Sequence, residues 1–453
     1  MRVCVIGTGY VGLTTGVCLA YLGHDVTCVD IDEAKIELLR SGKSPIYEPY
    51  LEDLLALAEP HLSYTTDYAE GVLGADVVFV AVQTPSLPDG GPDLRYLQAA
   101  AETIGRTLDG FTVVVNKSTV PIGSGNWVDA IIRDAFEERH GRKPNGDFAV
   151  ASNPEFLREG SAIGDTLYPD RVVVGSDDPR SLDALNRLYR PILDQSFTPP
   201  TFLPRPDDVS AVPLVSTDLA SAELIKYAAN AFLALKISYI NEIGQLASRV
   251  GADIEQVARG TGLDARIGSR FLQPGIGWGG SCFGKDTSAL IATADDYRLE
   301  MPIVEAAVRV NRRQRDLVVE KLLAELRILK GRTVSVLGLT FKPHTDDLRD
   351  APAIDIVRRL VAHGARVRLH DPVGMDQCRR QHPDLAPFLC QQLDEVFDGS
   401  DAVVLTTEWP QYLQLEWSKY VGLTRNPLVL DGRHALDPKR IRDAGFRYLS
   451  TTE

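Results

Sequence analysis

The sequence predicts an α/β protein in which two doubly wound domains are joined by a central all-helical domain. Short apolar runs alternate with helical patterns through the first part of the chain and again after residue 329, which favours mostly parallel sheets with helices on both faces. Between them, from about Asp218 to Leu329, the patterns are helical alone. We therefore expect domains over residues 1–200, 214–328 and 329–453.

Length and composition agree with this class. The chain has 453 residues, of which 44% are hydrophobic and 24% charged, enough for roughly two to four domains. The net charge of −14 argues against a general nucleic-acid binder. No signal peptide or bilayer-spanning run is evident, so we expect a cytoplasmic protein without a membrane partner. The six scattered cysteines suggest neither a disulfide framework nor a zinc site, and we expect no metal.

A glycine-rich turn follows the first predicted strand. Residues 2–6 read as that strand, a helical pattern begins near Leu13, and between them stands Gly7-Thr8-Gly9-Tyr10-Val11-Gly12. This is the dinucleotide-binding fingerprint in its required context. In that motif Gly7 makes the tight turn, Gly9 lets a pyrophosphate approach the backbone, and Gly12 permits close packing of helix on strand.

The next predicted strand, residues 26–29, ends in Asp30. A carboxylate there can accept hydrogen bonds from both ribose hydroxyls and would repel a 2′-phosphate, so we expect NAD rather than NADP as the cofactor. Loops after later strands, at Thr84 and at residues 118–121, should face the same cofactor because the carboxyl ends of parallel strands share one edge.

A second glycine-rich stretch contains a cysteine. It reads Gly275-Ile276-Gly277-Trp278-Gly279-Gly280-Ser281-Cys282-Phe283-Gly284-Lys285-Asp286. Glycines let the backbone come close to a ligand, and a nearby ammonium favours the thiolate of an accessible cysteine. We therefore expect Cys282 to be a nucleophile; the alternative is a flexible loop that happens to contain a cysteine.

Two further groups of polar residues stand where chemistry is possible. Glu223, Lys226 and Asn230 share one helix face in apolar surroundings. They either stabilise a reacting oxygen or form ordinary helix-face contacts. Residues 153–160 follow a predicted strand and contain two glutamates four apart. These carboxylates could act in acid–base catalysis or bind sugar hydroxyls, or they could simply form a solvated acidic turn.

The C-terminal part repeats the alternating pattern without the tight glycine triplet. A nucleotide-binding fold for a ligand other than NAD is the natural inference, against a plain α/β domain with no ligand. Lys342 and Arg433 each follow a predicted strand, where the phosphates or sugar of a nucleotide would lie, although each alone could be a surface charge.

In this order, the motifs resemble those of the UDP-glucose 6-dehydrogenase family, within the nucleotide-sugar 6-dehydrogenases. The resemblance covers almost the whole chain and extends through residues 7–12, 153–160, 222–230, 266–268 and 275–286 to 341–343 and 431–433. Residues 168–172 are more similar to the UDP-glucose branch than to the GDP-mannose branch. Two departures are Gly284, where many members have proline, and a proline-rich stretch, Pro199 to Pro213, that is longer than usual and reads as a linker or exposed loop.

The resemblance implies a four-electron oxidation of the C6 hydroxyl of UDP-glucose to a carboxylate by two NAD, through a thiohemiacetal and a thioester on a cysteine. Lys226 and Asn230 would stabilise charge on the C6 oxygen, while Asp286 and Thr119 would position water. The implied catalytic residues are Cys282, Lys226, Asn230, Asp286, Thr119 and, as a candidate general base, Glu155. The implied NAD contacts are Gly7, Gly9, Tyr10, Val11, Gly12, Asp30, Lys35, Thr84, Thr119, Glu159, Lys285 and Arg349.

The implied substrate contacts are Glu155, Phe156, Leu157, Arg158, Lys226, Asn230, Arg266, Phe271, Leu272, Gln273, Pro274, Gly275, Gly279, Lys342 and Arg433. Among these, Arg266 resembles an arginine that reaches the site from a neighbouring subunit, so a homodimer or higher homo-oligomer is implied. Three alternatives stay open: oxidation of another nucleotide-sugar, such as a UDP-N-acetylhexosamine or GDP-mannose; a nucleotide-sensing protein without turnover; and a redox-sensing role for the cysteine.

Overall fold

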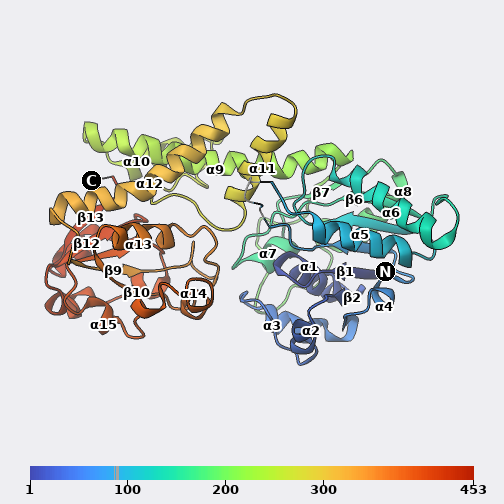
Figure 1. The fold of residues 1–453 in the computed structure, drawn as a ribbon, viewed down its shortest axis with the longest axis horizontal. Coiled ribbons are helices and arrows are strands. Elements are labelled where there is room, and N and C mark those ends of the chain that lie inside the picture. Colours follow the sequence, from blue (N-terminus) through green and yellow to red (C-terminus); the bar gives the residue numbers. More distant parts are fainter. Residues whose placement is uncertain (86, 88–90, 453) are drawn as a thin grey trace. The chain divides into compact units, whose positions relative to one another are not determined.

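The computed structural model describes residues 1–85, 87 and 91–452, which form two compact units, Met1–Ala228 and Ala229–Glu453 (Figure 1). The strands of the first unit are β1 (Arg2–Ile6), β2 (Asp25–Val29), β3 (Leu62–Thr65), β4 (Val77–Val80), β5 (Thr112–Asn116), β6 (Phe148–Ser152), β7 (Val172–Gly175) and β8 (Leu214–Thr217). Its helices are α1 (Tyr10–Tyr21), α2 (Glu33–Arg40), α3 (Leu51–Ala58), α4 (Tyr68–Val72), α5 (Arg95–Thr107), α6 (Ser124–His140), α7 (Ala162–Leu167), α8 (Pro179–Leu193) and the start of α9 (Leu219–Val250).

The first unit is built on an eight-stranded sheet with the order β3-β2-β1-β4-β5-β6-β7-β8. The strand pairs are parallel except β6 with β7, which are antiparallel. β2 and β3 lie on one side of β1, and β4 and the later strands lie on the other. The strand order therefore reverses at β1. A ligand crevice in such a sheet lies outside the carboxyl ends of the strands at that reversal.

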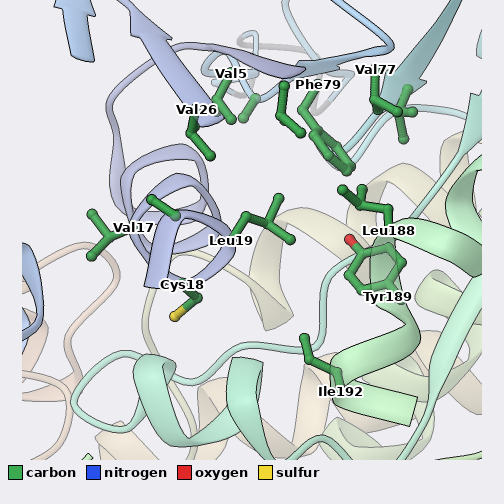
Figure 2. Packing of buried hydrophobic residues seen from close by; sticks show 14 of the residues in the cluster. Val5, Val17, Cys18, Leu19, Val26, Val77, Phe79, Leu188, Tyr189 and Ile192 are labelled. Carbon is green, nitrogen blue, oxygen red and sulfur yellow. The ribbon is translucent and has the colours of Figure 1, made fainter. Parts of the chain in front are cut away.

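Apolar side chains cover both faces of this sheet. One face packs against α1, α3, α7 and α8, and the other against α4, α5 and α6. Figure 2 shows the first of these clusters, where Phe79 of β4 lies among Leu19 of α1 and Leu188 and Tyr189 of α8. The strands read as continuous apolar runs because both of their faces are buried.

The proline-rich stretch was predicted to be a linker or exposed loop, and much of it is an exposed loop, with Pro204, Pro206 and Pro213 all exposed. Val212 is buried, and Phe202 and Leu203 pack against the first core cluster. The chain then pairs with β7 as β8, in parallel, before α9 begins. The segment therefore packs against the first unit through these three apolar side chains and leads directly into β8.

The second unit combines helices with a smaller sheet. After the remainder of α9, its helices are α10 (Ile254–Gly262), α11 (Phe283–Asp296), α12 (Pro302–Leu326), α13 (Pro352–Ala362), α14 (Met375–Gln381), α15 (Leu393–Phe397), α16 (Pro410–Leu413) and α17 (Pro438–Asp443). Its strands are β9 (Thr333–Leu337), β10 (Arg366–His370), β11 (Ala402–Leu405), β12 (Leu428–Asp431) and β13 (Arg447–Ser450).

This second sheet is parallel throughout, in the order β10-β9-β11-β12-β13. α12 and α13 pack on one face of the sheet (Figure 1). The other face packs against α15, α16 and α17. The prediction of two doubly wound domains joined by a helical segment is confirmed. Within the described residues, no helix has the length and apolar character needed to cross a membrane, and no group of three or more His, Cys, Asp or Glu could hold a metal ion.

Candidate active site

The glycine turn between β1 and α1 has the geometry that its motif predicts. Gly7 has φ +98°, and a Cβ there would lie 2.5 Å from the carbonyl oxygen of Ala81. A Cβ on Gly12 would lie 1.9 Å from the carbonyl oxygen of Gly7. A Cβ on Gly9, in contrast, would meet nothing within 4 Å. Gly7 and Gly12 are thus required by the fold, whereas the open space at Gly9 fits a closely approaching pyrophosphate.

This contrast separates folding from cofactor binding. We expect Gly12→Ala to lower the free energy of unfolding by about 3 kcal/mol, because its Cβ would force helix and turn apart. Gly9→Ala should unfold like the wild type and yet bind NAD at least about tenfold more weakly. Chemical denaturation and calorimetric titration with NAD measure the two effects. Normal NAD affinity in Gly9→Ala would contradict the placement of the pyrophosphate.

Asp30 is held at the end of β2 as a carboxylate. Its Oδ2 accepts hydrogen bonds from the backbone N–H of Thr8 at 2.8 Å and from the Thr8 hydroxyl at 2.7 Å, and its Oδ1 accepts one from the N–H of Asp32. Burial acts to raise the pKa of Asp30, but these hydrogen bonds and Lys35, 3.8 Å away, outweigh it and the pKa is lowered. The residues at this edge fit the adenosine half of NAD.

Two further loops meet at the same edge of the sheet. The hydroxyl of Thr84, after β4, donates to the carbonyl oxygen of Thr119, after β5, at 3.0 Å. The N–H of Gly160, next to Glu159, donates to the hydroxyl of Tyr10 in α1. Within the first unit, the structure therefore brings together the predicted NAD residues from β1, β4, β5 and β6.

A buried ion pair lies beyond the end of β6. Lys226 Nζ is 2.9 Å from Glu155 Oε1, and both residues are almost fully buried. Burial acts to raise the pKa of Glu155, but the charge and hydrogen bond of Lys226 and the N–H of Leu157 outweigh it, so the pKa is lowered. Oε1 of Glu155 bonds Lys226, and Oε2 accepts the N–H of Leu157. The geometry favours a role in holding Lys226.

Lys117 also belongs to this cluster, although the sequence did not single it out. Its Nζ donates to Oδ1 of Asn153 at 2.9 Å, and the hydroxyl of Tyr189 donates to the same oxygen. Burial, as the largest cause, lowers the pKa of Lys117 to about 8, while Glu155 acts to raise it. The sequence feature that could have identified Lys117 is its position directly after β5, at the carboxyl edge of the sheet.

Cys282 precedes helix α11 in the second unit as its N-cap residue and is partly exposed. Its Sγ lies 3.5 Å from the hydroxyl of Ser281. The N-terminus of a helix favours negative charge, which suits a thiolate. Gly284 lies in the first turn of α11, where the helix forms normally.

The loop before Cys282 is packed rather than flexible. A Cβ on Gly279 would lie 2.3 Å from the carbonyl oxygen of Asp350, and a Cβ on Gly280 would lie 2.8 Å from the ring of Phe341. The side-chain oxygen of Asn311 accepts from the N–H of Trp278, whose carbonyl accepts from the same side chain. The glycines therefore permit a close fit to the surrounding chain.

Asn230 and Asp286 meet beside this loop. Asn230 Nδ2 donates to Asp286 Oδ2 at 2.6 Å, and both residues are buried. Asp286 lies in the first turn of α11, and its N–H donates to the carbonyl oxygen of Cys282. The structure thus joins three of the predicted catalytic residues within the second unit.

Arg433, after β12, is placed differently from a simple ligand contact. Its guanidinium donates to the carbonyl oxygens of Thr406 at 2.7 Å, Phe341 at 2.9 Å and Gly277 at 3.1 Å. It therefore joins the cysteine loop to two strand ends of the second sheet. The N–H of Ile276 also donates to the carbonyl oxygen of Gly432, so the predicted substrate strip lies against this turn.

The other predicted site residues differ in exposure. Phe156 lies under the guanidinium of Arg171 and the ammonium of Lys226, at 3.8 and 5.5 Å from the ring centre. Arg349 pairs with Asp347, and Arg158 with Asp165. Of the remainder, Leu272, Pro274 and Gly275 are buried, Gln273 and Arg266 are exposed, and Val11, Leu157, Phe271, Gly279, Lys285 and Lys342 are intermediate.

These residues define a class of protein, a dehydrogenase that binds a dinucleotide on its first sheet. Models of the UDP-glucose/GDP-mannose dehydrogenase family match over residues 1–193 (NAD binding domain), 220–313 (central domain) and 335–438 (UDP binding domain). The chain belongs to the UDP-glucose/GDP-mannose dehydrogenase family, as its motifs predicted, and it is an NAD-dependent enzyme.

Individual relatives span the full chain. The chain is 45% identical to the UDP-glucose 6-dehydrogenase of Rhizobium meliloti, with 99% of both chains covered. It is 42% identical to the UDP-glucose 6-dehydrogenase TuaD of Bacillus subtilis, with 99% of this chain and 92% of that protein covered. A UDP-glucose dehydrogenase structure from Pyrobaculum islandicum aligns with a TM-score of 0.87 and 40% identity, covering 99% of this chain and 97% of that one.

Proposed function

We propose that this protein oxidises the C6 hydroxyl of UDP-glucose to a carboxylate, using two NAD per sugar and a covalent intermediate on Cys282. The single observation that carries the proposal is the partly exposed thiol at the N-terminus of α11, with the Asn230–Asp286 pair beside it. The names of relatives 42–45% identical over 99% of the chain support the choice of UDP-glucose.

The reaction balances without any further oxidant. NAD, when bound, accepts a hydride. Loss of hydride and a proton from the C6 alcohol gives an aldehyde, to which the Cys282 thiol adds as a thiohemiacetal. Loss of a second hydride and proton gives a thioester, and water releases the acid and restores the thiol. The sum is alcohol plus two NAD⁺ plus water, giving carboxylate, two NADH and three protons.

The chain's own residues divide this work. Lys226 and Asn230 stand one turn apart on α9, so both suit the stabilisation of negative charge on a C6 oxygen. Glu155 holds Lys226 in place through the 2.9 Å ion pair. Asp286, fixed by Asn230, and Thr119 are proposed to orient the hydrolytic water. Covalent capture by Cys282 keeps the aldehyde from escaping between the two oxidations.

The nucleotide half of the substrate belongs, in this proposal, to the second unit. The UDP binding domain of the family covers residues 335–438. Lys342 lies past β9 and suits a phosphate, whereas Arg433 shapes the adjoining turn through three backbone carbonyls. The substrate strip, residues 271–275, lies beside that turn.

We further propose a homodimer in the cytoplasm. Phe232, Tyr239 and Leu246 recur every seven residues along α9 and are 60%, 49% and 59% exposed. An apolar stripe of this spacing suits pairing with the same helix of a second copy. Arg266, whose side chain is 88% exposed, is then available to a neighbouring subunit. A reducing compartment would keep the six cysteines as thiols.

Turnover measurements test the proposed substrate. Purified protein with NAD and UDP-glucose should form two NADH per sugar and release UDP-glucuronate, whereas UDP-N-acetylhexosamines and GDP-mannose should react much more slowly. NADH formation with GDP-mannose alone would place the protein on the other branch of the family. NAD binding without turnover of any nucleotide-sugar would favour a sensing role.

A further inference from the structure

Glu223 makes an unusual contact between α9 and the start of α6. Its side chain is 3% exposed. Oε2 accepts the backbone N–H of Gly123 at 2.6 Å, and Oε1 accepts that of Gly125 at 2.8 Å. Gly123 is the N-cap residue of α6 and has no side chain of its own to cap the helix. The carboxylate therefore satisfies two N–H groups of a helix almost a hundred residues away in sequence.

The two glycines that Glu223 binds lie where the loop that contains Thr119 passes into α6. At the start of this loop, the N–H groups of Lys117 and Ser118 donate to the carbonyl oxygen of Val80. Its middle is fixed by the Thr84 hydroxyl on the Thr119 carbonyl. At the far end of the loop, the side chain of Glu223 binds the backbone N–H groups of Gly123 and Gly125. α9 also packs closely here, since a Cβ on Gly125 would lie 2.9 Å from Leu219.

We propose that Glu223 is a positioning residue for NAD: as a carboxylate it holds the far end of the loop of residues 117–123 and thereby the Thr119–Thr84 surface that contacts the cofactor. This deepens the proposed function and rests on its placement of NAD along that loop. Glu223 need not touch the cofactor or the sugar. It acts by fixing backbone that does.

The charge state of Glu223 decides how well it can act. Burial raises its pKa to about 7, against the lowering effect of the two N–H groups. The ionisable neighbours on α9 and in the loop, Lys226, Asp218 and Lys117, each bond elsewhere, and none of them is among the causes of this shift. Above pH 7 the carboxylate accepts both N–H groups. Below it, the added proton turns one acceptor oxygen into a donor, and one hydrogen bond is lost.

Calorimetric titration with NAD between pH 6 and pH 8 tests this role. Wild-type protein should bind NAD about fivefold or more weakly at pH 6 than at pH 8. The side chain of Glu223→Gln has one acceptor oxygen at every pH. The variant should therefore bind NAD about tenfold more weakly than the wild type at pH 8, and its own NAD affinity should be nearly the same at pH 6 as at pH 8. Asp218→Asn is the matched control, because it removes an exposed carboxylate from the start of the same helix without touching the loop. It should keep the wild-type affinities and pH dependence.

Two results would overturn the inference: wild-type NAD affinity that does not change across this pH range, or Glu223→Gln that binds NAD like the wild type at pH 8. The first needs no variant, so a folding defect leaves the test intact. Both are binding measurements without sugar. Failure of the wild-type protein to oxidise UDP-glucose would therefore contradict only the proposed function. Normal NAD binding and normal turnover by Glu223→Gln would contradict only the positioning role.

Discussion

Replacement of Cys282 by alanine is expected to lower UDP-glucuronate formation by at least about 10³-fold. Without the thiol, the aldehyde from the first oxidation has no sulfur adduct from which a second hydride can leave. In the presence of a carbonyl trap, we expect at most one NADH per sugar, formed slowly. NADH fluorescence and chromatography of the sugar products measure both quantities.

Cys282→Ser provides the complementary test. The hydroxyl is a weaker nucleophile than a thiolate, and the oxygen ester it forms hydrolyses more slowly than a thioester, so this variant should stall before acid release. Intact-protein mass spectrometry should then detect a sugar adduct, and peptide mapping should place it on the peptide that contains residue 282. Cys390→Ala is a matched control, since Cys390 is also partly exposed but lies before α15. Two NADH per sugar at the wild-type rate in Cys282→Ala would contradict the mechanism.

Lys226→Met should produce the second large loss, a fall in kcat of about 10²- to 10³-fold, because the cation proposed to stabilise charge at C6 is removed. The same change leaves Glu155 buried without its principal partner. Removal of one member of a buried ion pair lowers the free energy of unfolding by about 3–5 kcal/mol. Steady-state kinetics and denaturant unfolding report the two effects separately.

The double variant Glu155→Gln/Lys226→Met distinguishes catalysis from stability. It removes both charges, so most of the stability should return while activity stays low. Lys236→Met is the control on the same helix, where the lysine donates to the backbone of Ile267 and Gly268. If the double variant regained wild-type kcat, Lys226 would have only a structural role.

The sequence predicted the first sheet and its glycine turn well, for physical reasons that are local. A glycine with φ +98°, a close helix–strand contact and a terminal carboxylate all leave short-range signatures in residues 2–30. Strands β4 to β7 fit the predicted alternation of short apolar runs with helices, because strands buried on both faces are continuously apolar. The match to the family confirmed the identification that these motifs made.

What the sequence missed depends on contacts between distant residues. Glu48 accepts hydrogen bonds from the backbone N–H groups of Gly160 and Ala162, and it belongs to no periodic pattern. The helical spacing of Glu223 with Lys226 and Asn230 was recognised, but its contacts with Gly123 and Gly125 join segments far apart in the sequence. Lys117 looked like any lysine after a strand. The antiparallel β6–β7 pair was not predicted, and strand β8 lies within residues 214–328, which the sequence assigned to an all-helical domain.

The fit of Gly279 and Gly280 against Asp350 and Phe341 has a consequence for how the enzyme matures. Residues more than sixty positions downstream provide the template for the loop that ends in Cys282. A nascent chain that has emerged only as far as α12 would contain Cys282 but lack this template. The loop before Cys282 can therefore take its packed form only after synthesis has passed β9 and the turn at residue 350.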